Sequence, residues 1–224
     1  MELTTNSTIF SKFPTRKYNK GQLLLFQGEV PRFGFILKRG VIKEYDINKQ
    51  GNEQITWLIN KLEVFPFPWL MNSIPTVSYY YETVTDCEVY VLRKEEYYQL
   101  LTTNKEFLYR ELKRQALKEN EQTRRLAAVL NFKAENKLVN TFHYLIECYG
   151  EVVSSKIVKL DISLTHQDLA DLTGLTRETV SKEIGSLKKK GVISQLGDRT
   201  KYAFNLKNLN DLLSTPLSSP YLPK

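Results

Sequence analysis

Short apolar runs separated by polar residues and glycines fill the first part of the chain, from Gly21 to about Arg93. Five of these runs are rich in β-branched and aromatic residues: QLLLF, FGFILK, VIKEYDI, EQITWLI and CEVYVL. Several alternate with a period of two, which is typical of half-buried strands. Gly28, Gly40 and Gly51 lie between the runs at turn positions. Short strands at this spacing predict an antiparallel β-barrel or β-roll.

One segment of this region breaks the strand pattern, EVFPFPWLMNSIPTVSYYY at 63–81. Pro66, Pro68 and Pro75 interrupt it, and a proline cannot donate a hydrogen bond to a neighbouring strand. We therefore expect a loop or a short helical piece that crosses a face of the barrel.

A long helix is predicted from about Glu95 to Leu130, where the chain is rich in Lys, Glu, Gln, Arg and Leu and contains neither Pro nor Gly. A narrow stripe follows one of its faces: Leu108, Leu112, Ala116, Thr123, Ala127 and Leu130. Such a seam is typical of a helix that packs against a second copy, although a solvated helix packed on its own barrel also explains it. A second amphipathic helix is predicted over 136–150, with Gly150 as its C-cap.

Two short helices with a tight turn are predicted in LTHQDLADLTGLTRETVSKEIGSLKKKGVI, residues 164–193. Thr165 and Asp168 have the spacing of a capping box, Gly174 suits the turn, and Thr176 can cap the second helix. Apolar side chains recur at helical spacing on the inward side: Leu169, Ala170, Leu172, Val180, Ile184 and Leu187. This pattern predicts a helix-turn-helix.

The second of these helices carries polar residues on the outer side of its first two turns: Arg177, Glu178, Ser181 and Lys182. In a docked helix-turn-helix this part of the second helix enters the major groove of DNA and reaches the base edges. Arg177 or Lys182 could donate to guanine, and Glu178 could accept from cytosine. The alternative is an ordinary solvated helix face of mixed charge.

Positive charge follows on both sides of this helix. After three consecutive lysines, the segment VISQLGDRTKYAFNL predicts a hairpin wing that turns around Gly197 and Asp198. Such charge neutralises phosphates and fixes the register on DNA without reading its sequence. The residues expected to contact the DNA backbone are Thr165, Thr176, Thr179, Lys188, Lys189, Lys190, Arg199 and Lys201.

The composition agrees with an anionic partner, because 32 Lys and Arg residues outnumber 25 Asp and Glu residues among the 224 and give a net charge of +7. No window approaches 18 uncharged apolar residues, and the first residues lack the apolar run of a signal peptide. We therefore expect a cytoplasmic protein with no membrane partner.

Metal and cofactor chemistry has few candidate ligands. Cys87 and Cys148 lie far apart, and the two histidines, His143 and His166, do not stand at ligand spacing to them. We expect both cysteines in the core and no cofactor.

The chain resembles the Crp/Fnr family of bacterial transcription regulators over nearly its whole length. KGQLLLFQGEVPRFGFILKRGVIKEY is similar to the family's cyclic-nucleotide-binding-type β-roll, and GLTRETVSKE is similar to its recognition helix. The resemblance implies an α+β fold with four parts: a β-roll sensor domain at 1–103, a dimerisation helix at 104–131, a winged helix-turn-helix domain at 132–213 and a flexible tail at 214–224. It also implies a homodimer that binds an inverted repeat in double-stranded DNA and contacts RNA polymerase.

The predicted recognition helix matches the recognition helices of two branches of this family. Arg177 and Glu178 match the arginine and glutamate that read bases in the cyclic-AMP branch. Glu178, Ser181 and Lys182 match the Glu-x-x-Ser-Arg pattern of the oxygen-sensing branch, with lysine in place of arginine. Because lysine cannot make the planar fork of arginine, we expect an inverted repeat related to the half-sites of both branches.

The residues that bind the effector in each of these two branches are missing from this chain. A buried cyclic phosphate needs a cation and converging donors, which cyclic-AMP members supply with a Gly-Glu and an Arg-Ser or Arg-Thr pair. The corresponding pair here is Val77–Ser78, and LEVFPFPWL lacks the Gly-Glu, so cyclic AMP is not the expected effector. The iron–sulfur branch needs four cysteines, and the chain has two.

Aromatic residues take the place of the phosphate-binding residues, and their simplest explanation is packing inside the barrel. The alternative is an apolar pocket for an uncharged or planar effector, and its lining would be Phe65, Trp69, Val77, Ser78, Tyr79 and Tyr81. A third hypothesis is that no small ligand exists. The sequence leaves all three open.

The sequence therefore predicts a homodimeric, sequence-specific DNA-binding transcription regulator that an unknown effector modulates through the β-roll. An enzyme is not expected, because no histidine cluster, glycine-rich phosphate loop or nucleophile–base pair is recognisable. The remaining alternative is a ligand-binding module that regulates a protein partner without specific DNA binding.

Overall fold

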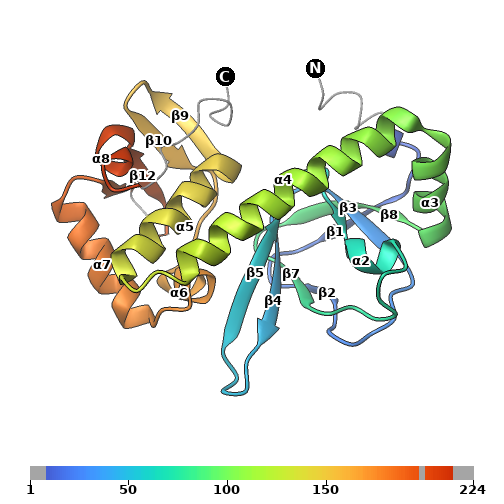
Figure 1. Ribbon diagram of the computed structural model, residues 1–224, viewed down its shortest axis with the longest axis horizontal. Helices are drawn as coiled ribbons and strands as arrows, with labels where there is room; N and C mark the ends of the chain where they lie inside the picture. The colour runs from blue at the N-terminus through green and yellow to red at the C-terminus, as the bar shows by residue number, and fades with distance from the viewer. Residues whose placement is uncertain (1–8, 197–199, 214–224) are drawn as a thin grey trace. The chain divides into compact units, whose positions relative to one another are not determined.

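The structure is a computed structural model that describes residues 9–196 and 200–213. The chain forms two compact units, which meet between Ala116 and Leu117. Helix α4 (Lys105–Val129) begins in the first unit and ends in the second (Figure 1).

The first unit contains two four-stranded antiparallel sheets, with the strand orders β1-β8-β3-β6 and β2-β7-β4-β5. The strands are β1 (Thr15–Tyr18), β2 (Leu23–Leu25), β3 (Gly34–Arg39), β4 (Ile42–Ile47), β5 (Glu53–Ile59), β6 (Val64–Phe65), β7 (Tyr80–Thr83) and β8 (Cys87–Leu92). This topology confirms the predicted antiparallel architecture of the N-terminal domain.

Strands β1, β6 and β7 fall outside the five predicted runs. Strand β1 reads TRKY, and three of its four residues are exposed, so its sequence shows no apolar alternation. It forms by pairing with β8, where Thr15 lies opposite Tyr90. The proline-containing segment does hold a short helix, α2 (Phe67–Leu70). The same segment also supplies β7, which lies between β2 and β4 and replaces part of the expected loop.

The single long helix predicted from about Glu95 is wrong at its beginning, because the structure has two helices there, α3 (Lys94–Thr103) and α4. Asn104 separates them with an extended backbone, and its side-chain Oδ1 accepts a hydrogen bond from the Phe107 amide at 2.9 Å. This capping contact starts α4 in a new direction. The break allows Phe107 and Tyr97 to meet edge to face, with ring centroids 6.1 Å apart.

A buried apolar cluster joins the sheets to these helices. It contains Trp69 from α2, Tyr97 from α3 and Phe107 from α4 together with Ile36 of β3. The start of α4 is therefore anchored to the first unit by packing. A half-buried ion pair adds to it, because Arg114 donates to the buried Glu111 and to the backbone oxygen of Leu62.

The second unit has a four-stranded antiparallel sheet with the order β11-β12-β10-β9. Its elements are α5 (Ala134–Tyr149), β9 (Gly150–Ser154), β10 (Ile157–Leu160), α6 (His166–Thr173), α7 (Arg177–Lys189), β11 (Ile193–Gln195), β12 (Tyr202–Asn205) and α8 (Leu206–Asn210). Strands β11 and β12 form the predicted hairpin wing. Its turn, with Gly197, Asp198 and Arg199, lies outside the described residues, and so does the expected tail at 214–224.

The helix predicted over 136–150 is present as α5, and Gly150 is its C-cap, as predicted. Gly150 has an extended backbone (φ −75°) rather than a left-handed one and begins β9. A side chain here would place its Cβ 2.4 Å from the backbone oxygen of Ile146. Close approach of the backbone therefore explains the glycine.

In the described ranges, 9–196 and 200–213, no helix is both long and apolar enough to cross a membrane. The same ranges contain no cluster of three or more His, Cys, Asp or Glu side chains that could hold a metal ion. Cys87 is buried, as predicted, and burial raises the pKa of its thiol. Cys148 is half-buried.

Candidate DNA-binding surface

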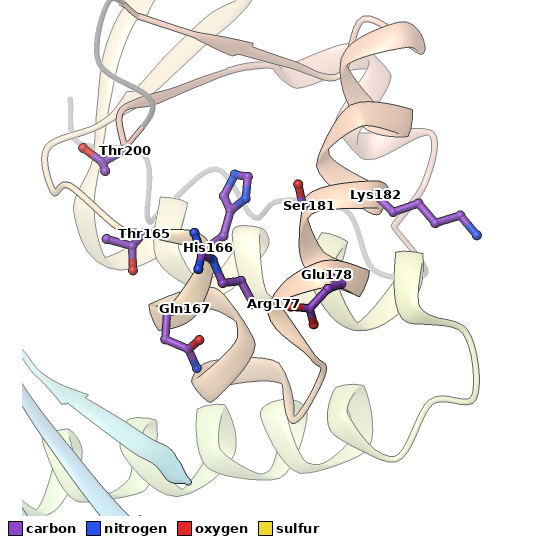
Figure 2. Close-up of a pocket in the computed structure, with 8 residues that line it drawn as sticks. All are labelled: Thr165, His166, Gln167, Arg177, Glu178, Ser181, Lys182 and Thr200. Carbon is purple, nitrogen blue, oxygen red and sulfur yellow. The ribbon is translucent and has the colours of Figure 1, made fainter.

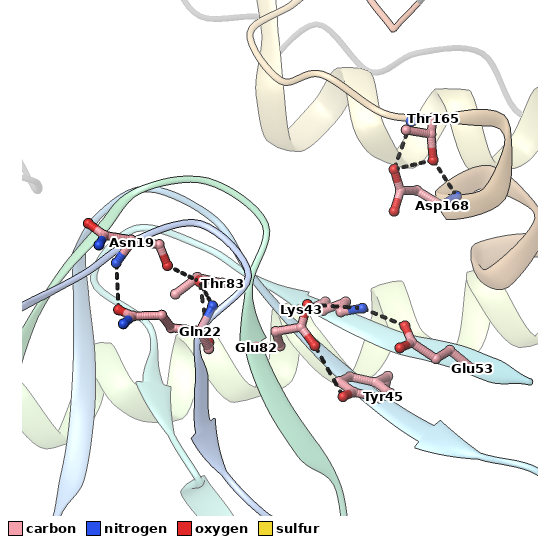
Figure 3. A network of polar contacts seen from close by, with 9 residues as sticks. All are labelled: Asn19, Gln22, Lys43, Tyr45, Glu53, Glu82, Thr83, Thr165 and Asp168. Atoms are coloured by element: carbon pink, nitrogen blue, oxygen red, sulfur yellow. Dashed lines mark hydrogen bonds and ion pairs between the residues drawn. The ribbon is translucent and has the colours of Figure 1, made fainter. Parts of the chain in front are cut away.

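Helix α6 begins with the predicted capping box. The Thr165 hydroxyl accepts a hydrogen bond from the Asp168 amide at 3.1 Å, and the Asp168 carboxylate accepts one from the Thr165 amide at 2.7 Å (Figure 3). The two residues thus satisfy each other's free backbone donors. Local contacts therefore start α6 at Thr165.

The turn between α6 and α7 also has the predicted residues in the predicted roles. Gly174 ends α6 with φ +66°, a left-handed conformation that suits glycine. The Thr176 hydroxyl then caps α7 by accepting from the Thr179 amide at 3.2 Å. All six inward residues are buried: Leu169, Ala170, Leu172, Val180, Ile184 and Leu187. The helix-turn-helix and its buried side are confirmed.

The outer side of α7 lines an open concave surface of about 940 Å³. Figure 2 shows its residues at the start of α6 and on the first turns of α7, together with Thr200, which precedes β12. The lining is Thr165, His166, Gln167, Arg177, Glu178, Ser181, Lys182 and Thr200. All four residues predicted to read bases belong to this one surface.

Charged side chains of this surface are available to a ligand. Arg177, Glu178 and Lys182 are exposed, and none of them forms an ion pair with another described residue. The surface therefore offers cationic donors and one anionic acceptor within two helical turns. Such a mixed set can read base edges, whereas phosphates alone would call for cations.

His166, Gln167 and Thr200 line the surface but escaped the sequence prediction. Gln167 sits in the first turn of α6 and donates to Asp171 at 2.7 Å, which holds its side chain in place. Thr200 comes from the far end of the wing, so only the folded structure brings it to α6. For His166 and Gln167, the sequence signal that could have indicated this surface was their position directly after the capping Thr165.

The residues predicted to contact the DNA backbone differ in how their side chains are engaged. Lys190 is in an ion pair with Glu135, and Lys188 donates to Gln195. Lys189 and Lys201 are exposed and have no such partner among the described residues. The hydroxyls of Thr176 and Thr179 lie 3.0 Å apart and share a hydrogen bond.

The six residues of the hypothetical effector pocket differ in their surroundings. Phe65 stacks on Tyr81, with ring centroids 5.4 Å apart, and both are almost fully buried. Trp69 instead belongs to the apolar cluster with α3 and α4, where Lys94 lies over its ring. Ser78 is exposed, Tyr79 is half-buried and Val77 is buried.

Two buried carboxylates accompany the aromatic residues of the roll. Glu44 accepts hydrogen bonds from the Tyr81 hydroxyl at 2.9 Å and from the Thr56 hydroxyl at 3.1 Å. Glu63 accepts from the Trp57 indole at 3.0 Å. Burial, followed by the nearby charge of Glu44, raises the pKa of Tyr81 well above its ordinary value, so Tyr81 stays a neutral donor.

The buried lysine of the roll is also engaged. Among the described residues, Lys43 is the one Lys or Arg that is buried. Its ammonium forms ion pairs with Glu53 and Glu82, and Glu82 also accepts a hydrogen bond from the Tyr45 hydroxyl (Figure 3). Two carboxylates therefore already neutralise this cation.

Comparison with known proteins identifies both units. Residues 15–104 match the model of a cyclic nucleotide-binding domain, and residues 124–214 match that of a Crp-like helix-turn-helix domain. A probable transcriptional activator of Rhizobium leguminosarum bv. viciae is 30% identical over 80% of this chain and 72% of its own length. An anaerobic regulatory protein of Bacillus subtilis (strain 168) is 25% identical over 80% of this chain and 75% of its own length.

Solved structures show the same fold. A CRP-family transcriptional regulator of Thermus thermophilus has a TM-score of 0.74 at 18% identity and covers 91% of this chain and 99% of its own. FixK2 of Bradyrhizobium japonicum has a TM-score of 0.75 at 16% identity and covers 91% and 98%. With its roll, its helix-turn-helix and these relatives, the chain belongs to the Crp/Fnr family of DNA-binding transcription regulators.

Proposed function

We propose that this transcription regulator binds an inverted repeat in double-stranded DNA as a homodimer, with α7 of each copy in the major groove of one half-site. The observation that carries the proposal is the division of α7 into two sides. Val180, Ile184 and Leu187 are buried, while Arg177 and Lys182 project from the concave surface without ion-pair partners among the described residues. A helix with this division offers its N-terminal turns to base edges.

The four residues of α7 have distinct roles in this proposal. Arg177 donates to guanine O6 and N7 as a planar fork, and Lys182 adds a single donor. Glu178 accepts from the amino group of cytosine, and Ser181 contacts a base or a phosphate. Because one of the four is anionic, the surface discriminates between sequences as well as attracting DNA.

Backbone contacts surround this reading surface. Phosphates bind near Thr165, Thr176 and Thr179 because the first turns of α6 and α7 present free amides, and near Lys188, Lys189, Lys190, Arg199 and Lys201. Lys189 and Lys201 contribute most among the described lysines, since Lys190 already pairs with Glu135 and Lys188 with Gln195.

The long helix supplies the dimer contact. We assign residues 1–103 to the sensor domain, 104–131 to the dimerisation helix and 132–213 to DNA binding. Leu112 and Leu130 are more than 60% exposed in the single chain, and burying such side chains against a second copy stabilises a dimer. The other members of the predicted stripe are Leu108, Ala116, Thr123 and Ala127.

The roll does not fit the cyclic nucleotide that its fold implies. An anionic phosphate needs a buried cation and converging donors. Lys43 is already neutralised by two carboxylates, and the buried Glu44 and Glu63 would repel an anion. Stacked Phe65 and Tyr81 fill part of the same unit. We infer that the roll modulates DNA binding through another effector or a protein partner.

Two further parts of the proposal come from the relatives. One of them is described as a probable transcriptional activator, which supports contact with RNA polymerase at a promoter in the cytoplasm. The regulator itself performs no chemistry on DNA, because the family consists of transcription regulators rather than enzymes.

Selection of duplexes from a random pool by the purified full chain, at physiological salt and without added ligand, should enrich an inverted repeat. Two half-sites about one helical turn apart are expected, because two α7 helices related by twofold symmetry occupy successive major grooves on one side of the duplex. A pool that stays random, with binding that hardly depends on salt, would favour the protein-partner alternative instead.

Single substitutions should distinguish residues that contact base edges from residues that contact the DNA backbone when the selected repeat is the ligand. Arg177→Ala and Glu178→Ala should each cost about 1–3 kcal/mol at the specific site and relax the base preference at one position per half-site. Lys189→Ala should weaken binding to all duplexes alike and lower the salt dependence. Fluorescence anisotropy measures the affinity of each variant for the specific and for a scrambled duplex. Equal losses of affinity for the two duplexes with Arg177→Ala would contradict the assignment of Arg177 as a base-reading residue.

Cyclic nucleotides should neither bind the full chain nor change its affinity for DNA. Calorimetric titration with cyclic AMP and cyclic GMP is expected to show no heat of binding up to millimolar concentration, because the two buried carboxylates oppose the phosphate. Weak, saturable binding of a cyclic nucleotide that becomes stronger with Glu44→Gln would support the electrostatic argument in part. Micromolar binding by the unaltered chain would contradict it.

A further inference from the structure

A buried polar cluster joins the end of α4 to α5, away from the residues that line the concave surface. Arg124 of α4 donates to Glu147 of α5 at 3.0 Å and to Glu121 of its own helix at 2.9 Å. His143 of α5 is 2% exposed and lies against the same guanidinium. All four residues belong to the second unit. Charged groups withdrawn from water are costly unless their contacts satisfy them, so the protonation of each member matters.

The geometry of the cluster calls for a neutral imidazole. Nη2 of Arg124 lies 3.0 Å from Nδ1 of His143 and 3.3 Å from its Nε2, and this Nε2 lies 3.1 Å from Oε1 of Glu147. A guanidinium can only donate a hydrogen bond, and a carboxylate can only accept one. The assignment that satisfies both neighbours leaves Nδ1 as an acceptor toward Arg124 and puts the proton on Nε2, toward Glu147.

A second proton on this ring would break the arrangement. It would have to bind at Nδ1, so two N–H donors and two cations would face each other at 3.0 Å. The side chain of Arg124 is 34% exposed, whereas that of His143 is 3% exposed. Arg124 is therefore the cation that can return to water, and Glu147 remains beside the protonated ring. Acid thus favours release of Arg124 from α5.

The titratable and charged groups around the ring come from the two helices that meet there: Glu121, Arg124 and Arg125 of α4, and Glu147 of α5. Burial acts to raise the pKa of Glu147, but its contacts with His143 and Arg124 hold that pKa below its ordinary value. Glu147 therefore stays anionic in mild acid. Burial raises the pKa of Glu121, so Glu121 is the second group that an experiment must distinguish from His143.

We propose that Arg124, His143 and Glu147 form a proton-sensitive clamp, which holds the last turns of α4 on α5 while His143 is neutral and opens when His143 takes up a proton. Helix α5 packs against α6 and α7, so the clamp attaches α4 to the core of the DNA-binding unit. Its three members are positioning residues.

The clamp makes DNA binding depend on pH, and this consequence rests on the proposed function. Two recognition helices bind both half-sites only while each is held in place, so an open clamp weakens binding to the repeat. The neutral ring is the form that closes the clamp, and histidine ordinarily takes up a proton near pH 6.5, to within about one unit. The contribution of the clamp is therefore present at pH 7.5 and is lost as the pH falls.

Hydrogen exchange of the full chain without DNA, corrected for the intrinsic exchange rate at each pH, measures the clamp itself. Protection of the amides of residues 118–129 should fall by about tenfold between pH 7.5 and pH 6.0. His143→Gln should keep similar protection at both pH values, because a neutral amide can accept from Arg124 and donate to Glu147 at either. Arg124→Gln should lower the protection at both.

Arg125→Gln is the matched control for Arg124→Gln. It removes the same charge from the neighbouring position, but Arg125 lies over the ring of Tyr144, 4.7 Å from its centroid, rather than against His143. The fall in protection between pH 7.5 and pH 6.0 should therefore persist with Arg125→Gln. A fall that disappears with both arginine variants would assign the effect to the general charge of α4 and overturn the clamp.

Fluorescence anisotropy with the selected repeat measures the consequence for DNA. The affinity of the unaltered chain should fall by about fivefold or more between pH 7.5 and pH 6.0, and His143→Gln should abolish the fall. His166, the other histidine of the chain, lines the concave surface. A proton on His166 adds a cation near phosphates and strengthens binding in acid. His166→Gln should therefore leave the fall in place or deepen it.

The outcomes separate the clamp from the proposed function. Acid-induced losses that persist with His143→Gln would assign the proton to another group, such as Glu121, and overturn the clamp. Protection that is the same at both pH values in the unaltered chain would overturn it as well, and protection that falls while DNA affinity stays constant would overturn its positioning role. Absence of specific DNA binding at either pH would contradict the proposed function, whereas hydrogen exchange without DNA would still decide whether the clamp exists.

Discussion

Burial of one side of α7 is the constraint on which the DNA-binding unit depends. Val180, Ile184 and Leu187 are each at most 1% exposed, and α7 packs against α5, α6 and β11. Rotation of the helix by one residue would expose these side chains and bury charged ones, at a cost of several kcal/mol (about 1.5–3 for each apolar side chain). The core therefore decides that Arg177, Glu178, Ser181 and Lys182 face outward together.

Local signals made this unit readable from sequence. The Thr165–Asp168 box, the left-handed Gly174 and the Thr176 cap each depend on residues at most three positions apart, and the structure has all of them. Contacts distant in sequence were missed. Strand β1 has no pattern of its own and exists by pairing with β8, and Thr200 reaches the concave surface only because the wing folds back.

The break between α3 and α4 shows a different limit of sequence reasoning. No proline or glycine marks it, and its sequence signal is limited to Thr102 and Thr103, which favour helices weakly, and Asn104, which favours an N-cap. Asn104 ends one helix and caps the next because Phe107 gains a buried position against Tyr97, and this gain is a property of the packed cluster. Likewise, sequence located the aromatic residues of the roll but not their distribution between separate groups around Phe65 and Trp69.

The roll and the long helix have different features available for an interaction. Buried carboxylates and a neutralised Lys43 make the roll a poor host for an anion, which supports the proposal that it responds to something other than a cyclic nucleotide. The predicted stripe of α4 leaves Leu112 and Leu130 more than 60% exposed in the single chain. Packing against α5, α6 and β11 fixes which residues of α7 face outward, and the long helix is the element proposed to join two such units.

The central claim is that α7 occupies the major groove at two places on one duplex. Methylation of guanine N7 by dimethyl sulfate tests it most directly, because N7 is accessible only from the major groove. The full chain on its selected repeat should protect guanines in both half-sites, at centres about 34 Å apart. Protection of adenine N3 in the minor groove alone, or of guanines in one half-site only, would contradict the account.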